Sequence, residues 1–161
     1  MPAGLAQFRG TATLQNIHPL IVHYPVAFLT ASVPIYLLAW ILRRELLESF
    51  GLWLLGLGTL SAAVAVYTGW SGSEGVMIAL SVREHILEYH KWLMLSAFGL
   101  STILSAWALL TPPMPQKGRT LFIIGLMLMA LILAKGADYG GWMVFGYNAG
   151  GSLQQPIEFS Q

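Results

Sequence analysis

The stretch LIVHYPVAFLTASVPIYLLAWIL, residues 20–42, decides the fold class of this chain. It holds no Asp, Glu, Lys or Arg, and it is longer than the roughly 20 apolar residues that a helix needs to cross a bilayer. Three further apolar segments follow at 51–70, at about 85–110 and at about 120–138. Because backbone polar groups in lipid must be hydrogen-bonded within the protein, we expect an all-α integral membrane four-helix bundle.

The composition of the whole chain agrees with this interpretation. Of the 161 residues, 56% are hydrophobic and 9% are charged, whereas soluble chains average about 25% charged residues. A formal net charge of +1 without a basic tail gives no electrostatic basis for nucleic-acid binding. Cysteine is absent, which excludes disulfides, thiol catalysis, iron–sulfur clusters and covalently attached c-type haem. No Ser/His/Asp motif or phosphate loop is visible, which favours an electron-transfer or accessory subunit over a stand-alone enzyme.

The chain divides into three parts by composition. Residues 1–17 form a polar N-terminal segment, 18–150 the four-span membrane domain, and 151–161 a C-terminal tail. The N-terminal segment has no apolar core and therefore does not look like a cleavable signal peptide. We expect the first span to direct the chain into the membrane.

The basic residues in the loops predict which side of the membrane each loop faces. Arg43 and Arg44 follow the first span, and Lys117 and Arg119 precede the fourth, so these two loops hold the compact basic clusters. By the positive-inside rule these loops face the cytoplasm, which predicts both termini on the periplasmic side of a bacterial inner membrane. Indole prefers the headgroup level, so we expect three tryptophans near each interface: Trp40, Trp53 and Trp107 near one, and Trp70, Trp92 and Trp142 near the other.

The fourth apolar segment ends in charged residues. Lys135 follows 14 uncharged residues, and Asp138 lies three positions later, so the two side chains can pair on one helix face at the membrane edge. The glycine-rich and aromatic-rich stretch that follows, GGWMVFGYNAGG at 140–151, is interpreted as an ordered turn at the interface.

An internal repeat relates the two halves of the chain. An offset of 67 residues aligns scarce residue types with each other: His18 with His85, His23 with His90, and Trp40 with Trp107. Gly69 falls on Gly136 at the same offset. We interpret this pattern as a duplicated helix hairpin. Because the first and third spans cross in the same direction, the copies would be related by a pseudo-two-fold axis along the membrane normal.

The histidines are the candidate ligands of a cofactor. The repeat would place His23 and His90 at equal depth on two parallel helices, which is the arrangement needed for the two axial ligands of a haem b near the outer membrane face. Histidines five residues apart on one helix lie roughly 140° apart, so one helix cannot aim both at the same point. His18 and His85 are therefore either a second ligand pair or structural residues.

Two alternatives stay open on the same residues. Three carboxylates on the histidine side, those of Glu74, Glu88 and Asp138, could support the ligand histidines or join them around a Zn or Cu ion. The chain lacks a tight metal spacing such as His-Glu-x-x-His, and the span midplanes hold no charged residue that would mark an ion pathway. The second alternative is a non-catalytic accessory subunit that anchors or braces a larger membrane complex.

Four motifs resemble a bacterial family of four-helix membrane domains of unknown function. The opening HPLIVHYP at 18–25 is similar to that family's HPLxVHFP, and three weaker matches follow: TGW at 68–70 with Glu74, LEYH at 87–90, and ADYGGWMVF at 137–145. The resemblance covers 18–150. Where the family often has a histidine in its last motif, this chain has Asp138, which implies a changed ligand set or cofactor number.

The resemblance also implies a context for function. Relatives of this family are often fused or adjacent to Rieske-type, rubredoxin-like or cytochrome c domains, which implies electron transfer. We therefore expect a membrane-anchored b-type cytochrome-like subunit that exchanges electrons between a periplasmic redox partner and a quinone or a neighbouring membrane subunit.

Overall fold

A computed structural model of the chain describes residues 16–75, 78–111 and 114–149. Within these ranges every regular element is helical. The elements are α2 (His18–Ile21), α3 (His23–Leu42), α4 (Glu45–Ser73), α5 (Leu80–Val82), the π-helical turn η1 (Arg83–Leu87), α6 (Glu88–Leu110) and α7 (Arg119–Tyr147). Four continuous helical stretches are long and apolar enough to cross a membrane: His18–Leu42, Glu45–Ser73, Leu80–Leu110 and Arg119–Tyr147. The all-α, four-span prediction is confirmed.

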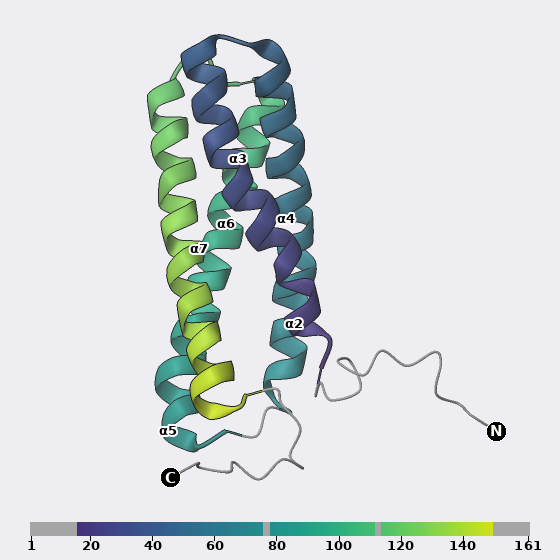
Figure 1. The fold of residues 1–161 in the computed structure, drawn as a ribbon, viewed down its shortest axis with the longest axis vertical. Coiled ribbons are helices and arrows are strands. Elements are labelled where there is room, and N and C mark those ends of the chain that lie inside the picture. The colour runs from purple at the N-terminus through teal and green to yellow at the C-terminus, as the bar shows by residue number, and fades with distance from the viewer. Residues whose placement is uncertain (1–15, 76–77, 112–113, 150–161) are drawn as a thin grey trace, which may run out of the picture.

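The four long helices stand side by side as a bundle (Figure 1). Helix α3 packs on α4 and α7, and α6 packs on the same two helices, so α3 and α6 occupy diagonal positions. Helices α3 and α4 form one hairpin and α6 and α7 the other. The beginning of α2 and the end of α7 lie toward the same end of the bundle (Figure 1). The duplication of the hairpin stays a prediction.

Glycines allow the two helices of each hairpin to approach closely. A Cβ added at Gly58 on α4 would lie 2.6 Å from the Leu29 side chain of α3, and one at Gly125 on α7 would lie 2.9 Å from that of Leu104 on α6. Lipid tails are as apolar as leucine, so helix association in a membrane depends on such close packing rather than on the hydrophobic effect. Gly58 and Gly125 are also equivalent in the 67-residue offset.

Large apolar side chains cover the outside of the bundle as well as its core. Leu29 and Leu126 are fully buried between the helices, whereas Leu60 and Leu131 are 69% and 68% exposed. Five of the six tryptophans are exposed on the outer surface: Trp40, Trp53, Trp70, Trp92 and Trp142. An apolar surface of this extent requires lipid around it, which agrees with a membrane-spanning domain.

Trp107 differs from the other tryptophans. Its ring packs edge-on against Phe122 at a centroid distance of 5.8 Å, and its six-membered ring lies over Gly118, which has a positive φ of 80°. Unlike the other five, this indole is half-buried and packs inward against the start of α7. That three tryptophans lie near each interface stays a prediction.

The fourth helix is longer than the apolar segment that predicts it. α7 continues to Tyr147, so the interpretation of the stretch from Gly140 as a turn is wrong for its first eight residues. Backbone groups near the membrane are best satisfied within a helix, and the glycines there pack against a neighbouring side chain. Lys135 and Asp138 pair at 2.9 Å on the exposed face of α7, as expected. Most of the predicted N-terminal segment and all of the tail lie outside the described residues.

The end of the bundle at the α3–α4 turn is closed by a buried polar group. Glu48 on α4, with a side chain 7% exposed, faces Arg119 of α7 at 4.0 Å across the bundle. The Tyr36 ring stands edge-on to Phe122 at 5.0 Å and is fully buried. The Tyr36 hydroxyl and Arg119 Nε find no hydrogen-bond partner among the described residues.

We predict that Tyr36→Phe raises the thermal stability of the purified protein. A buried hydroxyl without a partner costs about 1–3 kcal/mol of desolvation, and phenylalanine keeps the ring contact with Phe122. Thermal unfolding followed by circular dichroism in detergent measures the change. Tyr67→Phe is the matched control, because Tyr67 is 73% exposed on α4. A lower Tm for Tyr36→Phe alone would show that the hydroxyl is hydrogen-bonded in the membrane protein.

Candidate histidine site

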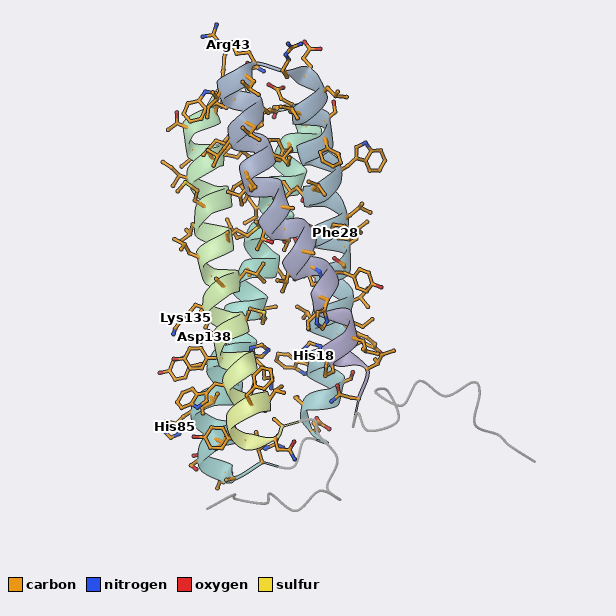
Figure 2. The ribbon with its side chains drawn as sticks, in the orientation of Figure 1. His18, Phe28, Arg43, His85, Lys135 and Asp138 are labelled. Atoms are coloured by element: carbon orange, nitrogen blue, oxygen red, sulfur yellow. The ribbon has the colours of Figure 1, made fainter. Side chains whose placement is uncertain are left out.

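The histidines gather toward the end of the bundle opposite the buried Glu48, and they differ in exposure. His18 on α2 and His90 on α6 are partly buried, whereas His23 and His85 are exposed. Figure 2 shows His18 within the lower half of the bundle and His85 on its outer side, close to the lower end. Nδ1 of His85 contacts the Ser81 carbonyl oxygen at 3.1 Å within its own helical stretch.

His18 is held by the second helix of its own hairpin. Its Nδ1 lies 3.2 Å from the Thr68 hydroxyl oxygen on α4. Thr68 donates its own hydroxyl hydrogen to the backbone carbonyls of Val64 and Ala65 at 3.0 and 3.1 Å. The Thr68 oxygen therefore accepts from Nδ1–H of His18. Gly69 makes room for the ring, since a Cβ there would lie 2.7 Å from Cε1.

His90 is held in the same way by the second helix of the other hairpin. Its Nδ1 lies 2.7 Å from the carbonyl oxygen of Gly136 on α7, and a carbonyl accepts only, so Nδ1 carries the hydrogen. A Cβ at Gly140 would lie 3.1 Å from Cε1 of the ring. Each partly buried histidine thus rests on a glycine of the following long helix and donates from Nδ1 to that helix.

The two partly buried histidines lie on helical stretches that are diagonal to each other in the bundle. His18 precedes α3 and His90 lies in the first turn of α6, and α3 and α6 occupy diagonal positions. A neutral imidazole with its hydrogen on Nδ1 presents the lone pair of Nε2, which is the usual ligand atom when Nδ1 is fixed by a hydrogen bond.

The repeat pairs the histidines differently from their burial in the structure, where the two partly buried histidines are His18 and His90. The pairs His23 with His90 and His18 with His85 stay predictions as ligand sets, but His23 and His85 are exposed. Local backbone contributes to the difference at His85. His85 lies in η1, whose wider i→i+5 turns rotate it relative to α6. The backbone at Val22 keeps right-handed helical angles (φ −61°, ψ −22°), so His18 and His23 lie on one continuous helical stretch.

The carboxylates do not assemble around the histidines. Glu74, Glu88 and Asp138 are all exposed, Glu88 pairs with Lys91 at 3.1 Å, and Asp138 pairs with Lys135. In the part of the chain that the structure describes, no group of three or more His, Cys, Asp or Glu side chains could hold a metal ion. The Zn or Cu alternative therefore gains no support from the arrangement of these residues.

The sequence analysis did not assign several residues that hold the histidine rings. Thr68 and the Gly136 carbonyl orient the rings, and Gly69 and Gly140 support them. The alignment of Gly69 with Gly136 in the repeat was a clue to the histidine site. Glycines in apolar sequences usually indicate helix packing, however, so this clue did not identify the site. A backbone carbonyl as hydrogen-bond acceptor leaves no mark in the sequence.

Comparison with known proteins adds a family assignment. The family described as predicted membrane protein (DUF2231) matches residues 14–152, which include all four spans and all four histidines. No curated protein and no solved structure matches the chain. The sequence resemblance to a four-helix membrane family of unknown function is thereby confirmed, and the chain belongs to the DUF2231 family of predicted membrane proteins.

Proposed function

We propose that this protein is a membrane-anchored, b-type cytochrome-like electron-transfer subunit that holds haem b between its two hairpins, with His18 and His90 as the axial ligands. The observation that carries the proposal is the matched support of these two rings. Each donates from Nδ1 to the neighbouring helix, each rests on a glycine, and they come from diagonal positions of the bundle.

The ligand count favours haem over a small ion. Zinc in structural sites takes four protein ligands, and catalytic zinc usually takes three. A haem iron needs only two ligands from the protein, since the porphyrin supplies the other four. The described residues offer two partly buried imidazoles and no larger group of ionisable ligands.

The hydrogen bonds at Nδ1 set the chemistry that the histidines can support. They fix the tautomer and the plane of each ring and increase the basicity of Nε2, which tunes a bound iron. Two histidine ligands leave no open coordination position, so the group supplies one-electron transfer rather than oxygen activation. The chain's own residues orient the ligands and exclude water by packing around them.

The proposal includes an orientation and partners. Arg43 and Arg44 lie at the end of the bundle away from the histidines, and Figure 2 labels Arg43 there. Cytoplasmic placement of this basic turn puts the histidine end and both termini on the periplasmic side of an inner membrane. A periplasmic or membrane redox subunit would then exchange electrons at that end.

We predict that the protein expressed with an adequate haem supply shows a pyridine haemochrome spectrum of haem b, and that His18→Ala and His90→Ala each lose it. Removing an axial ligand from a non-covalent haem removes most of its attachment. His85→Ala is the control, because His85 is exposed and contacts its own helical stretch.

The variant His23→Ala decides between the two ligand pairings. Unchanged haem content in His23→Ala, with loss in His18→Ala, supports the pair that the bundle brings together. The opposite pattern supports the equivalent histidines of the repeat. Haem-free wild-type protein would refute the proposal and leave an accessory or anchoring subunit.

We predict that Gly140→Leu also lowers haem content at least several-fold while the protein stays helical. The added side chain would displace the His90 ring, since even a Cβ comes within 3.1 Å of it. Gly56→Leu is the matched control, because no atom lies within 4 Å of a Cβ added there. Haem per protein from the absorbance ratio, measured on monodisperse material, reports the effect. Equal haem content in both variants would contradict the assigned role of Gly140.

A further inference from the structure

Two clefts meet on α4 directly beside His18. The first has a volume of about 340 Å³ and is lined by Asn16, Ile17, Thr68, Ser71, Gly72 and Gly75. The second has a volume of about 350 Å³ and is lined by Ala63, Val66, Tyr67, Trp70 and Ser71. Ser71 belongs to both, so the clefts follow one another along the last turns of α4.

The first cleft offers neutral hydrogen-bonding groups. The Asn16 side-chain oxygen accepts from the backbone N–H of His18 at 3.0 Å, which leaves the amide nitrogen of Asn16 as a donor. That nitrogen lies over Gly72, within 3.0 Å of an added Cβ. Thr68, which also lines the cleft, is the residue that accepts the hydrogen bond from His18.

The second cleft is apolar and opens on the lipid-facing side of the bundle. Tyr67 and Trp70 are 73% and 56% exposed there. A molecule that occupies both clefts therefore needs a polar head that accepts hydrogen bonds and an apolar tail that reaches the lipid.

The charge of the lining residues indicates whether a phospholipid headgroup or a neutral ring fits the first cleft. Among the described residues, neither cleft is lined by a Lys or Arg that would pair with a phosphate. Lys91 lies over the Trp70 ring at 4.4 Å, but it is already paired with Glu88 at 3.1 Å. A neutral ring with carbonyl oxygens fits the first cleft better than a phospholipid headgroup does.

We propose that the two clefts form one binding site for an isoprenoid quinone, with the quinone ring in the first cleft and the isoprenoid tail in the second. A quinone carbonyl would accept from the amide nitrogen of Asn16, and the ring would lie against Ser71 and Gly75, which also line the first cleft. A redox role for this site rests on the proposed haem function, since Thr68 both lines the first cleft and contacts the His18 ring. Quinone binding itself does not require haem.

The test is a titration of the purified full-length protein with decylubiquinone in nanodiscs, together with extraction and quantification of co-purified quinone. Wild-type protein is expected to bind the probe saturably. Gly72→Leu, which fills the first cleft, and Asn16→Ala, which removes the amide donor, are expected to weaken binding at least tenfold. Gly56→Leu on the same helix should bind like the wild type, because its added side chain meets no protein atom within 4 Å at Cβ.

Further measurements separate a loss of quinone binding from misfolding and from a loss of haem. Asn16→Ala is a small change that guards against a misfolded Gly72→Leu protein, and the helical content of each variant is measured by circular dichroism. Absent saturable binding by the wild type, or equal binding by all variants, overturns the quinone site. Loss of co-purified phospholipid instead of quinone in Gly72→Leu also overturns it. His90→Ala, which should lose haem, is expected to keep quinone binding, so the two proposals fail separately.

Discussion

Close approach of helix backbones at glycines is the constraint on which both the bundle and the histidine site depend. In lipid, helices gain little by hiding apolar surface from one another, so they must gain contact by packing closely. Gly58 and Gly125 accept leucines across each hairpin in the middle of the bundle. Gly69 and Gly140, nearer the histidine end, accept imidazoles in the same way. Close packing at glycines thus supports the fold in the middle of the bundle and positions the histidine rings near one end.

The two ends of the bundle are built for different tasks. At the end with the α3–α4 turn, Tyr36 packs on Phe122 and Glu48 faces Arg119, which ties α4 to α7 across the diagonal. At the other end, His18 and His90 each hydrogen-bond to the neighbouring helix, and a small apolar cluster also packs there. A buried ion pair contributes little net stability, but it does fix which helices meet. The closed end can therefore hold the register on which the histidine end relies.

The sequence predicts the membrane class and the four spans because apolar length leaves few alternatives in a bilayer. It does not predict where the fourth helix ends, since Gly140 and Gly141 favour a turn in water yet remain helical here against a packed neighbour. The sequence analysis also pairs the histidines by the 67-residue offset, and that pairing assumes the same backbone conformation in both copies of the hairpin. The π-helical turn Arg83–Leu87 breaks that equality in the second copy, where His85 lies.

A π-turn in front of α6 has a consequence for the site. The wider turns change the direction of His85 relative to an α-helical path, and His85 is exposed. His90 follows the π-turn and lies in the regular helix, where its direction is set by packing against α7. In the first hairpin the backbone stays right-handed helical through Val22, and His18 is the histidine that contacts α4. Only the second copy therefore has an irregular turn beside its histidines among the described residues, and composition and spacing do not reveal that turn.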